Sequence, residues 1–293
     1  MKRALFFGLA TLDIQYYIDE FPAGNIKVKS DPPEFFIGGP ATNAAVAFAA
    51  LNGRANLITA IGDNSFQSHF EKDFENCQVD VIDLLKNKTV QPVLATVVTS
   101  SNGERTIFTH NPARIEVELP VDELFNQLKP DVLMIDGFYA EQALAFCKEA
   151  RTRNIPVVFD GGSWKSHLPE LLFFIDFAIC SNDFIPPGCE NSETVFQFLN
   201  QFNIPNKVIT RGGEPLLFQH KNESGFIGVS PVDVVDTLGA GDFFHGAFCY
   251  YLLKEGDFET ALQQAAALAS HTCLFKGTRD WITKLTSALS FDF

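Results

Sequence analysis

The sequence predicts an α/β protein with a mostly parallel central sheet that is flanked by helices. Short apolar segments alternate with amphipathic helical stretches along the 293 residues, and the segments are apolar at successive positions, as in strands covered on both faces. The predicted strands cover residues 4–10, 55–61, 131–135, 156–159, 177–180 and 207–210. Ligands of such sheets bind beyond the carboxyl ends of the strands.

Composition and charge exclude several classes of function. The chain has 36 acidic and 22 basic residues, and its formal charge of −14 leaves no basic surface for nucleic acid. An anionic ligand must therefore be bound by local amides, a helix N-terminus or a metal ion. The six cysteines form no C-x-x-C pair, so neither a zinc ribbon nor a redox motif is indicated. The apolar segment 4–10 is too short to span a membrane and has no signal-peptide cleavage pattern, so we expect a cytoplasmic protein.

Two regions, residues 14–38 and 92–111, interrupt the alternation of strands and helices. They contain strand-like segments that no helix follows, at residues 15–20, 27–37, 93–101 and 105–110. The last two are separated by Asn102-Gly103, a strong turn signal. These regions predict a small β lid on a single domain of residues 1–293, although periodicity alone favours a pair of surface hairpins.

The chain ends in a helical section that starts at a small-residue loop. The predicted helices cover residues 243–253, 258–275 and 279–288, with stops at Gly256 and Gly277. Directly before the first helix stand Gly239, Ala240 and Gly241, and Asp242 lies in its first turn.

This loop has the features of a phosphate site with a base beside it. Small residues let an anion approach the unpaired N–H groups of a helix N-terminus, and Asp242 could accept a proton from a hydroxyl that attacks phosphorus. The alternative is an ordinary turn in which Asp242 only stabilises the helix dipole. The surrounding residues favour the first interpretation, because 236–248 (DTLGAGDFFHGAF) resembles the C-terminal signature of the ribokinase-like (PfkB) carbohydrate kinase family.

The resemblance implies a ribokinase-like three-layer fold with a β lid and an ATP-dependent phosphotransferase activity on a sugar hydroxyl. It implies that Gly239, Ala240 and Gly241 form an anion hole for the transferring phosphate and that Asp242 is the catalytic base. It also implies that Asp236 and Thr237 hold the loop, contact the nucleotide phosphates or line a site for a monovalent cation such as K⁺.

Residues 38–45 (GGPATNAA) resemble the N-terminal signature of the same family and imply an acceptor site. The resemblance assigns Gly38 and Gly39 to close backbone approach to the sugar and Asn43 to a side-chain hydrogen bond. From the residues alone, the segment can equally be a helix entry with Asn43 as a cap. Asp13, beyond the first strand, is predicted to bind acceptor hydroxyls, with a turn-forming aspartate as the alternative.

Other polar residues after strands and in the lid are further candidates. Arg105 could reach from the lid to the acceptor or phosphate, and a solvated surface position is the alternative. Asp160, at the end of a strand, is a weaker candidate for the acceptor or the phosphates.

The nucleotide is expected to bind residues that follow two later strands. The resemblance implies nucleotide contacts for Asn182, Thr210 and Gly212, in addition to the loop that begins at Asp236. Many family members carry Asn-x-x-Glu where this chain has Asn182 followed by Ile185, so the ligands of the expected Mg²⁺ stay unknown. An apolar adenine pocket is expected from residues 229–235 and 269–277.

Two alternatives remain open from the sequence. Adenosine kinases share both signatures, and the lid aromatics Tyr16, Tyr17, Phe35 and Phe36 permit stacking on a base, so the acceptor can be a nucleoside. A non-catalytic sugar- and nucleotide-binding regulator is the other alternative. Lids of this family often pair between subunits, so a homodimer is also compatible with the sequence.

Overall fold

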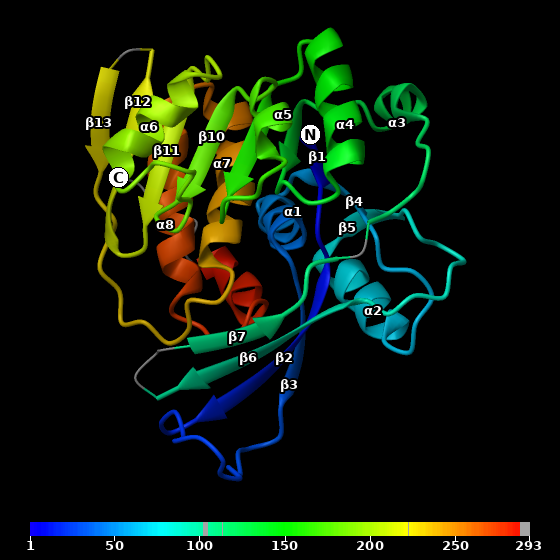
Figure 1. Cartoon of the computed structure of the whole chain (residues 1–293), viewed down its shortest axis with the longest axis vertical. Coiled ribbons are helices and arrows are strands. Elements are labelled where there is room, and N and C mark those ends of the chain that lie inside the picture. The colour runs from blue at the N-terminus through cyan, green and yellow to red at the C-terminus, as the bar shows by residue number, and fades with distance from the viewer. Residues whose placement is uncertain (102–104, 113, 222, 288–293) are drawn as a thin grey trace.

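A computed structural model describes residues 1–101, 105–112, 114–221 and 223–287. It confirms a central sheet, which has nine strands (Figure 1). In order across the sheet these are β13 (Glu223–Ile227), β12 (Glu214–His220), β11 (Asn206–Arg211), β10 (Phe177–Ser181), β9 (Val157–Gly161), β8 (Val132–Ile135), β1 (Arg3–Phe7), β4 (Arg54–Thr59) and β5 (Val79–Asp83). All neighbours from β11 to β5 are parallel, and β12 and β13 are added antiparallel at one edge.

Helices cover both faces of this sheet. One face packs against α1 (Pro40–Ala50), α2 (Gln67–Cys77), α7 (Ala240–Glu255), α8 (Phe258–Thr272) and the 3₁₀ helix η1 (Asp280–Ser287). The other packs against α3 (Val121–Leu128), α4 (Ala140–Thr152), α5 (Leu168–Leu172) and α6 (Ser192–Asn200). Strand β1 is apolar along most of its length because both of its faces are buried. Ala4 and Phe6 pack into the core on the α1 side, and Leu5 and Phe7 pack into the core on the α4 side. Across the described ranges, no helix has the length and apolar character needed to cross a membrane.

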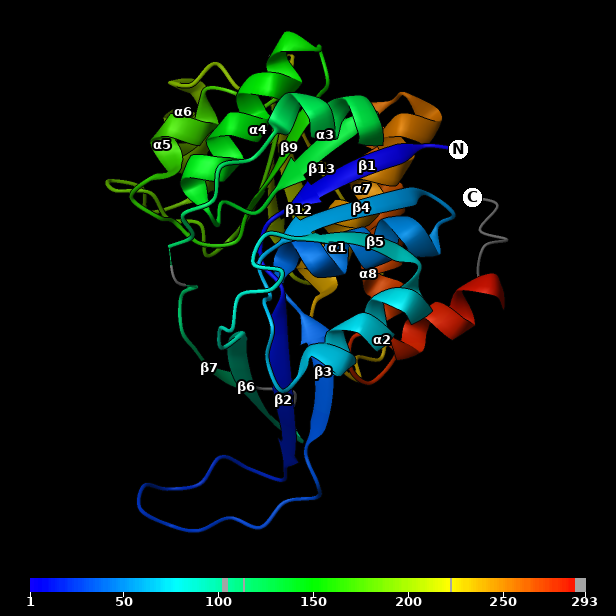
Figure 2. The same cartoon turned by 90° about the vertical axis from the view of Figure 1, so that its right-hand side faces the viewer.

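The predicted lid is one sheet rather than two separate hairpins. Its strand order is β3 (Glu34–Gly38), β2 (Thr11–Ile18), β6 (Val93–Ser100) and β7 (Arg105–Thr109). The parallel pairing of β2 with β6 joins the two regions, and the lid projects from the core (Figure 2). Residues 27–33, predicted as strand, instead belong to the long connection between β2 and β3. The predicted turn at Asn102-Gly103 lies outside the described residues.

Several predicted boundaries need correction. The first strand ends at Phe7 and not at residue 10, and α7 begins at Ala240, inside the small-residue loop. The segment predicted as a last α-helix is the 3₁₀ helix η1 over its described part. Trp281 anchors this 3₁₀ helix. The centre of its buried ring lies 5.0 Å from that of Phe243, and its indole N–H donates to the Thr278 carbonyl.

Candidate active site

The amino ends of α1 and α7 meet beside the carboxyl end of β1. The hydroxyl of Thr42 donates to the Leu9 carbonyl at 3.0 Å, which ties the first turn of α1 to the chain just after β1. Helix α7 then packs closely on α1 at Gly246, where a Cβ would lie 2.0 Å from the Ala44 carbonyl oxygen. A side chain at position 246 would separate the two helices, so glycine is what allows their first turns to share one site.

Asn43 and Asp242 form the centre of this site. The Asn43 Nδ2 donates to Asp242 Oδ2 at 2.8 Å, although 199 residues separate them in sequence. Asn43 does not cap α1, whose N-cap is Gly39 without any side-chain bond, so the capping interpretation is wrong. Asp242 lies in the first turn of α7, after Gly239 in the left-handed conformation with φ 76°.

The environment of Asp242 keeps its carboxyl protonated to unusually high pH. Burial is the main cause, and the nearby Asp160 carboxylate adds to it, so that the pKa of Asp242 is raised to about 7. The hydrogen bond from Asn43 and the nearby His245 oppose this increase in pKa. A carboxyl with a pKa close to neutrality can accept and return a proton at physiological pH.

Arg279, a residue that the sequence did not single out, fixes the orientation of Asn43. Its Nη1 donates to Asn43 Oδ1 at 3.0 Å, and its Nη2 donates to the Ile37 carbonyl at 2.7 Å. The Nε and Nη2 atoms also form a two-pronged ion pair with Asp73 of α2 at 3.0 and 2.9 Å. Since a guanidinium can only donate, the oxygen of the Asn43 amide must face Arg279, and its nitrogen must face Asp242.

Asp13 lies in strand β2, so the turn-forming interpretation is wrong. Its carboxylate is buried and accepts a hydrogen bond from the Thr11 hydroxyl at 2.6 Å. Burial raises the pKa of Asp13 to about 6, while the Thr11 bond and the charge of Arg279 lower it. A Cβ at Gly38 would lie 2.1 Å from Asp13 Oδ2, so the backbone at Gly38 closes directly on this carboxylate.

Two further carboxylates lie at strand ends close to the first pair. Asp136, after β8, accepts from the backbone N–H groups of Leu9, Ala41 and Phe138 at 2.8, 3.3 and 3.0 Å. Burial raises the pKa of Asp136 to about 6. Asp160 ends β9 with a buried Oδ2 that has no hydrogen-bond donor in the described part of the chain.

His245 lies 3.5 Å from this Asp160 oxygen but is occupied elsewhere. Its Nδ1 faces the Gly241 carbonyl at 2.7 Å, and its Nε2 faces the Ile179 carbonyl at 3.1 Å. Because Nδ1 is directed at Gly241, the contact with Asp160 is electrostatic rather than a hydrogen bond. This buried oxygen of Asp160 therefore lacks a hydrogen-bond donor in the described part of the chain.

Asp236 connects the lid to the C-terminal segment. Its carboxylate accepts hydrogen bonds from Gln15 Nε2 and the Tyr17 hydroxyl, both at 3.2 Å, and both donors lie in β2. It also accepts from the backbone N–H groups of Leu238 at 2.9 Å and Gly277 at 3.0 Å. Three of these donors reach Oδ2 and one reaches Oδ1, so Asp236 fixes the loop before α7 against the lid.

Arg105 provides a second connection between the lid and this loop. It lies at the start of β7, and its Nη1 donates to the Thr237 hydroxyl at 2.8 Å. The guanidinium is thus directed toward the loop that contains Gly239 rather than into solvent alone.

The residues predicted to bind nucleotide lie on a more open surface. Asn182 is exposed after β10, the Thr210 hydroxyl donates to a β10 carbonyl at 3.4 Å, and Gly212 lies in the turn from β11 to β12. Arg211 folds back onto its own hairpin, where Nε donates to the Pro215 carbonyl at 2.8 Å. Arg211 is therefore held away from these residues.

The two segments predicted to hold adenine are neighbours. The backbone N–H of Val235 donates to the Cys273 carbonyl at 2.8 Å, which joins residues 229–235 to 269–277. Val234 and Val235 are both 56% exposed, which leaves an apolar surface uncovered beside the loop.

A comparison with protein families assigns the chain. The family described as pfkB family carbohydrate kinase matches residues 1–284. The chain belongs to this family. As a pfkB kinase, it transfers a phosphoryl group from ATP to a sugar or a related small metabolite. The ribokinase-like resemblance of the two signatures is thereby confirmed.

Relatives and solved structures match most of the chain. A deoxyribokinase from Salmonella typhi is 22% identical over 292 residues, covering 93% of this chain and 92% of the relative. A ribokinase from Lactococcus lactis is 25% identical over 299 residues, covering 98% and 95%. The structure of Arabidopsis thaliana ribokinase, described as complexed with ribose and ATP, matches with a TM-score of 0.80 at 19% identity, covering 99% and 100%. At this identity the structural likeness establishes the fold.

Sequence patterns predicted some residues of this site and missed others. The two signatures located Asn43 and Asp242 and predicted their shared site. Asp136 had a usable signal, since an acidic residue followed by Gly137 stands directly after a predicted strand. Arg279 had none, because a single arginine in a C-terminal helical segment gives no indication that it contacts α1 and α2.

Proposed function

We propose that Asp242 is the general base that activates an acceptor hydroxyl for attack on the γ-phosphate of ATP. The observation that carries the proposal is the position of its carboxyl in the first turn of α7, held by Asn43 at 2.8 Å, with a pKa near 7. The group combines a fixed orientation with proton affinity suited to neutral pH.

The chemistry follows from this placement. The acceptor oxygen forms a bond to the γ-phosphorus while the bond from that phosphorus to the bridging oxygen breaks, and ADP leaves with the bonding electron pair. The hydroxyl proton passes to Asp242 as negative charge moves onto the phosphoryl oxygens. Residues Gly239, Ala240 and Gly241 are proposed to stabilise that charge with the first amides of α7, of which the Ala240 N–H makes a long bond of 3.3 Å to the Thr237 carbonyl.

The acceptor is proposed to bind between the lid and the first turn of α1. Asp13 would accept hydrogen bonds from acceptor hydroxyls. Because Asp13 is buried, a ligand without such hydroxyls would leave its carboxylate unpaired, so the site would discriminate against that ligand. Gly38 and Gly39 allow the acceptor to approach the backbone, Asn43 contributes its amide, and Arg105 closes the lid side.

The nucleotide is proposed to lie along the open surface formed by Asn182, Thr210 and Gly212, with its phosphates at the loop that starts at Asp236 and Thr237. Val234 and Val235 suit an adenine ring, because they are apolar and exposed beside this loop.

A Mg²⁺ ion fits this site through Asp160. Within the described ranges, no group of three or more histidine, cysteine or acidic side chains is arranged to hold a metal, which agrees with an ion bound mainly by phosphates and water. Asp160 is the candidate oxygen ligand, and because its unpaired Oδ2 is buried, the carboxylate would have to turn toward the phosphates to reach the ion. When bound, the ion would neutralise charge on the β- and γ-phosphates. A monovalent cation such as K⁺ stays a prediction for the loop at Asp236 and Thr237: Oδ2 of Asp236 accepts three hydrogen bonds, whereas Oδ1 accepts one, from the Leu238 N–H.

The exposed surface of the lid supports a homodimer. Phe35 and Phe108 are 47% and 66% exposed and lie on the same face of the lid sheet, because both belong to the register row of Ile14 and Thr96, so a second lid on that face would bury both. Light scattering after gel filtration tests this, and a monomer at micromolar concentration contradicts it.

ADP release is the direct test of the proposed function. Wild type and Asp242→Asn are compared with ATP and Mg²⁺ over a panel of sugars, sugar acids, sugar phosphates and nucleosides. We expect at least one acceptor to stimulate turnover and the substitution to lower kcat by about 10²–10⁴-fold. An unchanged kcat in Asp242→Asn excludes Asp242 as the base. A nucleoside as the preferred acceptor would favour the nucleoside kinase alternative, and nucleotide binding without any turnover would favour a regulator.

A further inference from the structure

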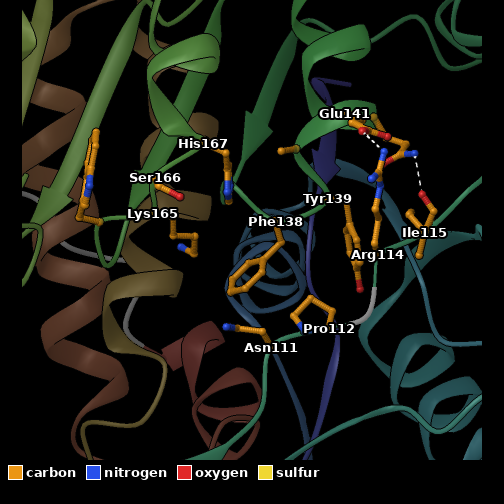
Figure 3. Close-up of a pocket in the computed structure, with 13 residues that line it drawn as sticks. Asn111, Pro112, Arg114, Ile115, Phe138, Tyr139, Glu141, Lys165, Ser166 and His167 are labelled. Atoms are coloured by element: carbon orange, nitrogen blue, oxygen red, sulfur yellow. Dashed lines mark hydrogen bonds and ion pairs between the residues drawn. The ribbon is translucent and has the colours of Figure 1, made fainter.

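A cavity of about 620 Å³ opens beside the proposed acceptor site (Figure 3). Its walls come from the chain after β7, the chain after β8 and the chain after β9. Phe138 and Tyr139 connect it to the site, because they follow Asp136, whose carboxylate binds the backbone at Leu9 and Ala41. The volume lies in the range of small-molecule pockets, roughly 300–1,000 Å³.

Lys165 gives this cavity a positive charge without an ion pair to any described residue. Its ammonium lies 4.4 Å from the centre of the Phe138 ring and donates to the Ser163 carbonyl at 3.5 Å, and its charge acts on the Asp136 carboxylate at longer range. The other cation of the wall, Arg114, is neutralised by an ion pair with Glu141. A lysine fixed over an aromatic ring keeps an available charge.

Uncharged donors accompany this charge. Asn111 and Ser166 line the same cavity, and neither side chain makes a hydrogen bond to a described residue. In Figure 3, Lys165, Ser166 and Asn111 border the space in front of Phe138. An ammonium, a hydroxyl and an amide together suit an anion, since each can donate a hydrogen bond.

The polarity of the two neighbouring spaces is opposite. Asp13 and Asp242 offer oxygens that suit hydroxyl groups, whereas the cavity offers donors and, among the described residues, the cation of Lys165 without an ion-pair partner. In a chain with a formal charge of −14, an anionic ligand depends on such a local cation. We infer that this cavity binds a carboxylate or phosphate group of the acceptor, with Lys165 as its counter-charge. The inference rests on the proposed function and specifies its substrate class: a hydroxylated metabolite with an anionic group remote from the phosphorylated hydroxyl.

Kinetics with matched acceptors test this substrate class. Ribose is compared with ribose 1-phosphate, and glucose with gluconate, in wild type, Lys165→Met and Lys165→Arg. We expect the anionic member to have the lower KM in wild type, and Lys165→Met to raise that KM by about 10–100-fold. The KM values of the neutral sugars and ATP should stay within about twofold, and Lys165→Arg should recover most of the loss. Lys148→Met, which removes an exposed charge on α4 outside the cavity, is the matched control.

Three results would overturn the inference. They are equal KM changes for neutral and anionic acceptors, no change in either, or a rise confined to the KM of ATP. The last would assign Lys165 to the nucleotide phosphates instead.

Calorimetry separates the failure of this inference from failure of the proposed function. Ribose 1-phosphate, gluconate and the other sugar acids and sugar phosphates of the panel are titrated into wild type and Lys165→Met without ATP. Binding to wild type that Lys165→Met loses supports the anion site even if no ADP is released, and then only the proposed function fails. No binding of any anionic acceptor, or equal binding to both proteins, overturns the anion site even if a neutral sugar is phosphorylated. Thermal unfolding of Lys165→Met and Lys165→Arg checks that each variant is folded.

Discussion

The proposed acceptor half and the proposed nucleotide half of this site are built differently. On the acceptor side, Asp13, Asn43 and Asp242 are buried or partly buried and are held by hydrogen bonds that the protein makes to itself. On the nucleotide side, Asn182 and Val235 are exposed and depend on few side-chain contacts. The difference indicates that the protein orients the base before any substrate arrives, whereas ATP binds an open surface. Substitutions on the two sides should therefore differ in kind as well as in size.

The strongest test of this preorganisation is Arg279→Lys. A lysine keeps a positive charge beside Asp73, but one ammonium cannot reproduce the donors that reach Asp73, Asn43 and the Ile37 carbonyl together. The Asn43 amide is then free to turn, and Asp242 loses an oriented donor. We expect kcat/KM to fall by about 10–100-fold in the ADP-release assay.

A pH profile distinguishes positioning by Arg279 from a merely structural role. The Asn43 bond lowers the pKa of Asp242, so its loss should move the acidic limb of kcat/KM to higher pH. The control is Asp73→Asn, which weakens the ion pair but leaves the bond from Arg279 to Asn43. It should lower the unfolding temperature without moving the limb. A limb that stays in place in Arg279→Lys would mean that the arginine acts only through stability.

The pH dependence of the wild-type enzyme should show the raised pKa of its base. Asp242 must be deprotonated to accept a proton, and its pKa is about 7, so kcat/KM should fall below that pH. At pH 6 we expect about one tenth of the plateau value. An acidic limb centred near pH 4 would show that the carboxyl is not in the environment described above. A solvent-exposed aspartate would give that result.

The same carboxylate should reduce the stability of the folded protein. The pKa of Asp242 is raised on folding, so the folded state binds the proton more tightly than the unfolded chain does. Its contribution to stability is present below the unfolded value of 3.8 and is lost as pH rises through about 7. At pH 8, Asp242→Asn should raise the free energy of unfolding by about 1 kcal/mol.

Urea denaturation of wild type and Asp242→Asn measures this difference. The gain should be smaller at pH 6 than at pH 8, because the wild-type carboxyl is then largely protonated. The amide oxygen of the asparagine can still accept the bond from Asn43, so this hydrogen bond is not the variable. A variant that is less stable than wild type at pH 8 would contradict a buried charge at this position.

The sequence predicted those parts of the molecule that are specified by local pattern. Alternating strands and helices gave the central sheet, and the small-residue loop before a helix located Asp242 at the start of α7. Asn43 lies beside Asp242, while its role as a sugar ligand stays a prediction; the sequence also left a helix cap open, since both roles suit an asparagine in a first turn. Periodicity could not decide how two pairs of strands assemble into a lid, because parallel pairing of β2 with β6 joins segments that are distant in sequence.

What the sequence did not show depends on contacts across the fold. Arg279 acts on Asn43 over 236 residues, and Asp136 binds the backbone of Leu9 over 127. Contacts between residues so far apart in the sequence leave no local sequence pattern that would predict them. The cavity at Lys165 is similar, since it exists only where segments after three different strands converge.

The smallest effect is expected on the nucleotide side, from Asn182→Ala. The side chain is exposed and makes no hydrogen bond to a described residue, so its removal should change the free energy of unfolding by less than about 0.5 kcal/mol. One exposed hydrogen bond to ATP corresponds to a rise in the KM of ATP of about threefold, with kcat and the acceptor KM unchanged. Initial rates at varied ATP and saturating acceptor measure this. A fall in kcat of tenfold or more would place Asn182 among the residues that orient the reacting groups, and the nucleotide half would then be as preorganised as the acceptor half.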